Sequence, residues 1–235
     1  MTADPHAQDT RGPDTRAAGT LAADARITSG AGQARTGLRL LWRHAASRRV
    51  PAAVAAIAAC AIGLRLALIA HWDAYGALQL PLVFETAAAA AIVVTTASPF
   101  GEPERVAGGR LPFLRLATAL ALTAAAIGAL AAAGTGAHLA GGSLDVLRNM
   151  AGLTGLGLLC AAVLGGSLGW AGPACYLVAG VYALYTQWHG PALTTPWIWP
   201  ARPPHDLGAA LCAGLVGLLG LALFTMRGAR DPAGE

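Results

Sequence analysis

Residues 51–70 read PAAVAAIAACAIGLRLALIA, and this stretch decides the fold class. It carries a single charged side chain, Arg65, and is otherwise almost entirely apolar. A helix needs about 20 such residues to cross the ~30 Å hydrocarbon core of a bilayer. Five similar stretches follow, so the sequence predicts an all-α membrane protein with six spans, at residues 51–70, 78–97, 112–133, 149–167, 170–187 and 207–226.

The composition agrees with this prediction and excludes some chemistry. The chain of 235 residues is 55% hydrophobic and only 12% charged, and all 16 of its basic residues are arginine. Without lysine it can form neither a phosphate-binding loop of the G-x-x-x-x-G-K-[ST] type nor a Schiff base. The four cysteines lie inside apolar segments without C-x-x-C spacing, so we expect no disulfide, no zinc and no cofactor.

The segments that flank the spans are polar. Residues 1–35 have almost no large apolar side chain and are predicted to be a disordered cytoplasmic tail. Residues 36–50 are predicted to form a basic amphipathic helix at the membrane interface, with Trp42 dipping into the bilayer; its basic residues are Arg39, Arg43, Arg48 and Arg49. The alternative is a charged flank of the first span. Residues 51–227 then form the six-helix domain, and 228–235 a short cytoplasmic tail.

The distribution of arginine predicts the orientation. With the N-terminus inside, 13 arginines lie on the cytoplasmic side, and Arg148 and Arg202 are the two on the outside. Cytoplasmic loops of membrane proteins carry an excess of basic residues, so both termini are predicted to be cytoplasmic.

Two ionisable residues, Arg65 and Glu85, fall inside predicted spans. Counting at 1.5 Å per residue places both at about 10 Å from the outer surface. Because a short loop joins the first two spans, these helices are predicted to be antiparallel neighbours, with Arg65 and Glu85 forming an ion pair. Whether such a pair is structural or belongs to a substrate or proton site stays open.

The segment between the fifth and sixth spans is rich in proline and tryptophan. Its five prolines exclude a regular helix, and Trp188, Trp197 and Trp199 favour the level of the lipid headgroups. The segment is therefore predicted to form an external rim. A gate facing the substrate and an aromatic anchor are equally compatible with this pattern.

Two further patterns involve small residues. Gly165–Gly169 matches G-x-S-x-G but lacks the preceding strand that a nucleophile elbow requires, so we expect it to serve helix packing. Ala209, Ala213 and Gly217 recur at four-residue spacing in the sixth span, with Gly214 and Gly220 beside them. Such a stripe allows close approach of another helix, either within the chain or in a second subunit.

Together these features resemble the membrane subunit of type 2 ATP-binding-cassette transporters, in particular the small six-span permeases of actinobacteria. The resemblance covers residues 36–230 and rests on the order of four stretches: 38–49, 98–105, 147–156 and 196–200. It implies a multi-pass subunit of the plasma membrane without catalytic residues of its own. It also implies a second permease, identical or different, and separate ATPase subunits that dock from the cytoplasm.

Within this resemblance, the segment at 98–110 is predicted to dock the ATPase through Glu102, Glu104 and Arg105. Attraction to the membrane does not explain an acidic pair so close to the headgroups, although a solvated turn is the alternative. We expect a permease that exports a hydrophobic or amphiphilic compound and has no nucleic-acid partner. The alternative function is a non-transporting scaffold or regulatory anchor for another complex.

Overall fold

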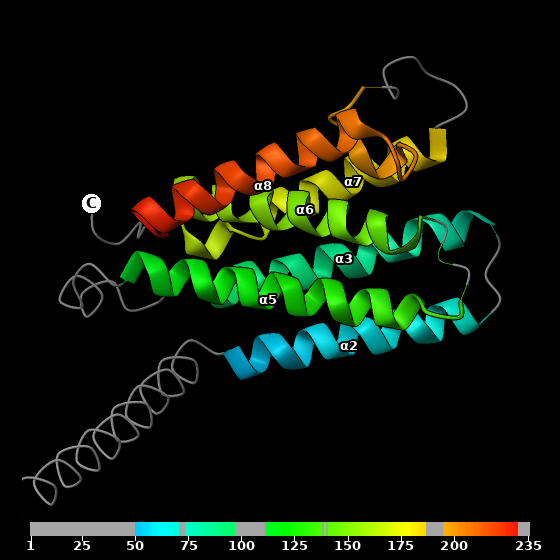
Figure 1. Ribbon diagram of the computed structural model, residues 1–235, viewed down its shortest axis with the longest axis horizontal. Coiled ribbons are helices and arrows are strands. Elements are labelled where there is room, and N and C mark those ends of the chain that lie inside the picture. The colour runs from blue at the N-terminus through cyan, green and yellow to red at the C-terminus, as the bar shows by residue number, and fades with distance from the viewer. Residues whose placement is uncertain are drawn as a thin grey trace, which may run out of the picture. The chain divides into compact units, whose positions relative to one another are not determined.

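The computed structural model describes residues 50–70, 74–96, 111–137, 139, 141–186 and 195–229, and these residues form helices and connections without any strand. The long helices, drawn in Figure 1, are α2 (Val50–Ile69), α3 (Ala74–Thr96), α5 (Leu111–Gly134), α6 (Gly142–Leu164), α7 (Ala171–Thr186) and α8 (Leu207–Arg227). Six helical segments are long and apolar enough to cross a membrane; the fifth, Gly166–Thr186, joins α7 to the short 3-10 helix η2 (Gly166–Leu168). The prediction of an all-α chain with six such segments is confirmed.

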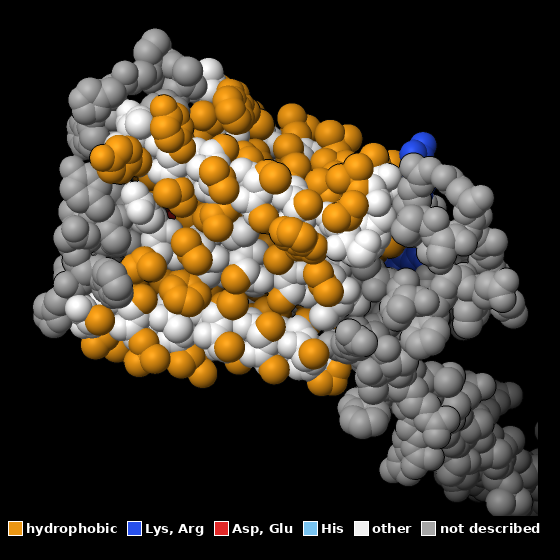
Figure 2. All heavy atoms as spheres, turned by 180° about the vertical axis from the view of Figure 1, so that it is seen from behind, with side chains coloured by type: hydrophobic (Ala, Val, Ile, Leu, Met, Phe, Trp, Pro, Cys, Tyr) orange, Lys and Arg blue, Asp and Glu red, His pale blue; other side chains and the backbone are white. Residues whose placement is uncertain are grey.

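The surface of the bundle is apolar, as the interior of a bilayer requires. On α8 the side chains of Leu211, Leu215 and Leu218 are 67%, 59% and 66% exposed. Figure 2 shows hydrophobic side chains distributed along the whole length of one face, with arginine atoms visible at one end. In water such exposure costs about 25 cal/mol per Å² of apolar surface, whereas lipid chains solvate it. The helices therefore indicate a multi-pass membrane protein.

Helix α6 is the centre of the bundle. In a stretch of 18 residues of this span 67% are buried, against 44% or less in a stretch of the same length in each of the other five. Val146, Met150 and Leu153 of α6 belong to one core cluster, together with residues of α2, α3, α5 and α7. Leu158 and Ala161 contribute to a second cluster, with Phe224 of α8. Its position explains why α6 can carry polar side chains: protein surrounds them, so they do not meet lipid.

The stripe of small residues on α8 packs within the chain. A Cβ added at Gly155 of α6 would lie 2.4 Å from the Cα of Gly217, and one added at Gly220 would lie 2.0 Å from the carbonyl oxygen of Gly155. The backbones of α6 and α8 are therefore in direct contact, which small residues alone permit. Ala213 also faces α6, since a Cβ at Gly152 would lie 3.2 Å from its Cβ, whereas a Cβ at Gly214 would meet nothing within 4 Å.

The turn between α6 and α7 uses the glycine-rich stretch that resembles a nucleophile motif. Gly165 has φ +108° and ψ +154°, a conformation available almost exclusively to glycine. The 3-10 helix η2 follows, and Pro173 is buried within the first turn of α7. A proline is tolerated there because the first backbone N–H groups of a helix have no partner inside it. The fourth span, predicted to end at residue 167, thus ends earlier, before Gly165.

The boundaries of five spans lie close to their predicted positions, but α6 begins at Gly142, seven residues before the predicted start at Asn149. The prediction placed Arg148 on the outside and began the span at the next residue, Asn149. Asp145 and Arg148 pair with one another one turn apart, and Arg148 and Asn149 are buried inside the bundle. Arg148, predicted to lie in an external loop, is therefore part of a helix.

Successive helices run in opposite directions, so the start of α2 and the end of α8 lie at the same end of the bundle (Figure 1). A Cβ at Gly228 would lie 2.4 Å from a guanidinium nitrogen of Arg115, which places the end of α8 beside the start of α5. The predicted tail at 1–35, the interfacial helix with Arg39, Trp42, Arg43, Arg48 and Arg49, the docking residues Glu102, Glu104 and Arg105, and Trp188 lie outside the described residues.

Candidate functional site

A cluster of buried polar side chains lies at the end of the bundle where α6 begins. Arg148 and Asn149 of α6 are 5% and 6% exposed, and Glu85 of α3 is 1% exposed. Ionisable groups inside a membrane bundle are costly and are usually paired or functional. This cluster is therefore the candidate functional site of the described part of the chain.

Glu85 is held by an amide. The side-chain Nδ2 of Asn149 donates a hydrogen bond of 2.9 Å to Oε2 of Glu85. Among the described residues no arginine forms an ion pair with this carboxyl group, because Arg148 pairs with Asp145. Glu85 thus brings α3 to α6 through a neutral partner in the core.

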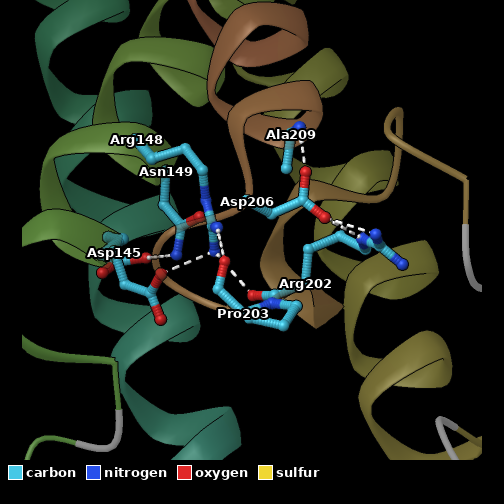
Figure 3. Close-up of polar contacts among 8 residues, drawn as sticks. Asp145, Arg148, Asn149, Arg202, Pro203, Asp206 and Ala209 are labelled. Atoms are coloured by element: carbon cyan, nitrogen blue, oxygen red, sulfur yellow. Dashed lines mark hydrogen bonds and ion pairs between the residues drawn. The ribbon is translucent and has the colours of Figure 1, made fainter.

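Arg148 connects α6 to the chain that precedes α8. One of its terminal nitrogens lies 2.7 Å from Oδ1 of Asp145 and donates to the carbonyl oxygen of Arg202 at 3.2 Å. The other donates to the carbonyl oxygen of Pro203 at 2.9 Å. Figure 3 shows Arg148, Asp145 and Pro203 facing one another at the point where this segment crosses α6. The guanidinium group suits this task because its donors form a rigid planar fork.

The segment at 195–206 is folded into the bundle by aromatic contacts as well. Trp199, in the 3-10 helix η4 (Trp199–Ala201), is 3% exposed and stacks on Tyr176 of α7, with ring centroids 4.3 Å apart and planes at 21°. Its ring fills the space that Gly152 leaves on α6, where an added Cβ would lie 2.5 Å from the indole. The hydroxyl of Tyr176 donates to the carbonyl oxygen of Trp197 at 2.9 Å.

Asp206 completes the attachment of this segment to α8. Its Oδ1 accepts a hydrogen bond of 3.0 Å from the backbone N–H of Ala209, which caps the first turn of the helix. Its Oδ2 accepts a hydrogen bond of 2.6 Å from Nε of Arg202, four residues earlier. The bond from Ala209 and the neighbouring Arg202 side chain hold the pKa of the Asp206 carboxyl group below its ordinary value.

Besides Oδ1 of Asp145, which faces Arg148, four buried polar atoms near the cluster have no hydrogen-bond partner among the residues that the structure describes: Nε of Arg148, Oδ1 of Asn149, Oγ1 of Thr154 and Nε1 of Trp199. A buried polar group without a partner costs about 1–3 kcal/mol. Donors and acceptors are both represented, so this part of α6 has the chemistry to hold a small polar group or a water molecule. In the described part of the chain, no three His, Cys, Asp or Glu side chains are grouped as a metal site would require.

The structure does not bring Arg65 and Glu85 together. The guanidinium group of Arg65 donates to the carbonyl oxygens of Ala133 and Thr135, at 3.3 and 2.6 Å, at the end of α5. The residue of α3 that packs against α2 here is Phe84, not Glu85, since a Cβ added at Gly63 of α2 would lie 2.6 Å from the Phe84 ring. Successive side chains on a helix point about 100° apart, so Glu85 faces α6. The predicted ion pair between Arg65 and Glu85 is therefore wrong.

The tryptophans of the predicted external rim have different environments. Trp197 is 53% exposed, and its place in an external rim stays a prediction. Trp199 is buried between α6 and α7, so its assignment to the rim is wrong. A high content of tryptophan in a segment favours the level of the lipid headgroups. It does not show, however, whether a given indole lies at that level or fills a gap in the protein core.

Sequence reasoning missed Asp145, Arg148, Asn149 and Tyr176 as members of one site. A signal for the first three was present, because Val146 and Met150 are four residues apart and continue the apolar spacing of α6 upstream of Asn149. Asp145 and Arg148 are also three residues apart, the spacing at which opposite charges pair on a helix.

In comparisons with family models, curated proteins and solved structures, the chain matches none of them.

Proposed function

We propose that the chain is the permease subunit of an ATP-binding-cassette transporter of the plasma membrane, exporting a hydrophobic or amphiphilic compound. A separate ATPase subunit supplies the energy, and a second permease, identical or different, completes the pathway. The resemblance of residues 36–230 to the small six-span permeases is the basis of the proposal. The observation that supports it best is the segment at 195–206, which precedes α8 and folds back into the bundle against α6.

In this proposal the two ends of the bundle have different tasks. The end of α3 and the start of α5 lie at the same end of the bundle as the start of α2 and the end of α8 (Figure 1). The excess of arginine in the flanking segments favours the cytoplasm for that end. The polar cluster and the segment at 195–206 then belong to the external side, away from the ATPase.

Cysteine labelling tests the orientation. In a background without the four native cysteines, Trp197→Cys should react with a membrane-impermeant maleimide in intact cells. Arg227→Cys, at the opposite end of α8, should react only after permeabilisation. Both positions are exposed, so accessibility within the protein does not decide the result. The reverse pattern would refute the proposed orientation and, with it, the cytoplasmic docking of an ATPase.

Reversing the charge of Glu102 and Glu104 tests the coupling. The double substitution to arginine adds positive charge on the side predicted to be cytoplasmic, so insertion should survive. We expect the ATPase to be lost from the complex that is purified with the tagged chain in mild detergent, and substrate-stimulated ATP hydrolysis to fall. The matched control reverses Asp231 and Glu235 in the C-terminal tail, an equal change of charge on the same side, and should leave both unchanged.

Mass spectrometry of the purified wild-type complex distinguishes the two functions. A stoichiometric nucleotide-binding subunit supports the permease. A stable complex with other proteins and without an ATPase refutes it in favour of a scaffold. Equal recovery of the ATPase with the wild-type chain and with the Glu102/Glu104 variant would instead exclude this loop as the docking site.

A further inference from the structure

A groove between α2 and α5 is lined by apolar side chains and by Arg65. Its volume is about 420 Å³. Its lining includes Ile62 and Leu66 of α2 and Ala129 and Ala132 of α5. Ile62 and Leu66 are 61% and 63% exposed, so the groove opens on the surface that the six spans turn toward lipid.

The guanidinium group of Arg65 has donors to spare. Nη1 donates to the carbonyl oxygens of Ala133 and Thr135. Within the described part of the chain, Nε and Nη2 donate to no acceptor, and no carboxylate forms an ion pair with Arg65. The C-terminus of α5 supplies the negative end of a helix dipole, equivalent to about half a charge, so it neutralises the arginine only in part.

The depth of Arg65 matches the headgroup region. It lies four residues before Ile69, the last residue of α2, or about 6 Å along the helix axis. Its partner Thr135 directly follows the last residue of α5, so the side chain points toward the end of the bundle. A long basic side chain near the end of a span reaches the interface in this way while its aliphatic stem stays among apolar groups.

From this geometry we propose that the groove binds a phospholipid of the surrounding bilayer, with one acyl chain between α2 and α5 and the phosphate at Arg65. The free edge of the guanidinium group can donate two hydrogen bonds to a phosphate diester, the arrangement that arginine forms best. The alanines of α5 leave room for the chain, and Ile62 and Leu66 flank it. This site is separate from the Glu85–Asn149 cluster and does not depend on the proposed transport function.

Native mass spectrometry of the full chain tests the proposal. The probes are phosphatidylglycerol and the diacylglycerol with the same acyl chains, which lacks the phosphate. The wild-type protein should retain phosphatidylglycerol preferentially. Arg65→Gln should weaken its binding on the order of tenfold through loss of charge-assisted hydrogen bonds and remove the preference over diacylglycerol. Arg65→Lys keeps the charge without the fork and should lie between the two.

Two further variants separate the parts of the site. Ala132→Phe places a ring in the exposed groove and should reduce the retention of both lipids while Arg65 stays in place. Arg227→Gln removes one exposed positive charge at the opposite end of the bundle and should change nothing. Circular dichroism and size-exclusion chromatography show whether each variant is folded. The Ala132 variant keeps the proposal testable if Arg65→Gln does not fold.

Three results would overturn the proposal. Equal retention of phosphatidylglycerol by the wild type and by folded Arg65→Gln or Ala132→Phe excludes the site. Displacement of the lipid by low concentrations of inorganic phosphate indicates a site for a free anion. Loss of a dimer in Arg65→Gln indicates that a second copy of the chain occupies the groove.

Discussion

Gly155→Ala tests the contact between α6 and α8, on which the centre of the bundle depends. The new Cβ would lie 2.4 Å from the Cα of Gly217 and 2.5 Å from the carbonyl oxygen of Val216. The shorter distance is about 1 Å below the start of the ordinary contact range at 3.4 Å. Both neighbours are backbone atoms, so a change of rotamer cannot relieve the overlap. The two helices must move apart along this contact.

The expected cost follows from the opposing effects of one methyl group. Inserting a methyl group into a well-packed interface costs about 1–3 kcal/mol. Alanine regains at most ~1 kcal/mol over glycine through its higher helix propensity. Because the obstacle is backbone, we expect a net loss of about 2 kcal/mol in the free energy of unfolding. Gly214→Ala in α8, where nothing lies within 4 Å of the added Cβ, should be neutral or slightly stabilising.

Unfolding by sodium dodecyl sulfate in mixed micelles, followed by helical circular dichroism, measures this difference. Gly155→Ala should unfold at a lower detergent fraction than the wild type, and Gly214→Ala at the same or a higher fraction. Equal midpoints for Gly155→Ala and the wild type would refute the close contact of α6 and α8. An equal loss in both variants would show that glycine is needed for another reason than packing.

Three further predictions use the same unfolding assay. Trp199→Ala empties the space beside Gly152 and should lower the free energy of unfolding by about 3–5 kcal/mol. Trp197 is exposed, so Trp197→Ala should lower it by at most ~0.5 kcal/mol. Similar losses in the two variants would contradict the burial of Trp199. Glu85→Leu leaves the amide of Asn149 unpaired and should lower the free energy of unfolding by about 1–3 kcal/mol. The double variant with Asn149→Leu should recover part of this loss. Purely additive effects of the two substitutions would exclude the hydrogen bond. The pKa of Asp206 is lowered in the folded state, so its stabilising contribution is complete above its ordinary pKa of about 3.9. This contribution disappears as the pH falls through the lower pKa of the folded state. Asp206→Asn should remove this acid-dependent loss of stability, and an acid unfolding profile equal to that of the wild type would refute the role of Asp206.

The membrane spans could be predicted from the sequence because the thickness of a bilayer sets their length. The first predicted span, at 51–70, differs from α2 by one residue at each end, and the sixth, at 207–226, differs from α8 at one end. A long apolar run has no other stable environment, so composition alone identifies it. The start of α6 could not be found in this way. Arg148 is acceptable there because Asp145 and two backbone carbonyl groups surround it, and one of these carbonyls lies 55 residues away along the chain.

The partners of the buried charges were beyond sequence reasoning for a geometric reason. Counting residues along the helices predicted similar depths in the membrane for Arg65 and Glu85. Their helices, α2 and α3, are indeed neighbours, as the contact of Gly63 with Phe84 shows. Depth does not fix direction, however. Rotation by one residue turns a side chain about 100° around the axis, which is enough to exchange α2 for α6 as the neighbour of Glu85. Which face of α3 meets which helix depends on the packing of the whole bundle.

Gly152 shows why the polar cluster and the close packing of α6 form one unit. The indole of Trp199 and the side chain of Ala213 both lie within 3.2 Å of the Cβ that this glycine lacks. One turn earlier, Arg148 holds the carbonyl oxygens of Arg202 and Pro203. The segment at 195–206 therefore rests on the same surface of α6 as α8 does. Lifting Trp199 from this surface would break the bonds of Arg148 and uncover the contact with Ala213, so this segment and the start of α8 must move together.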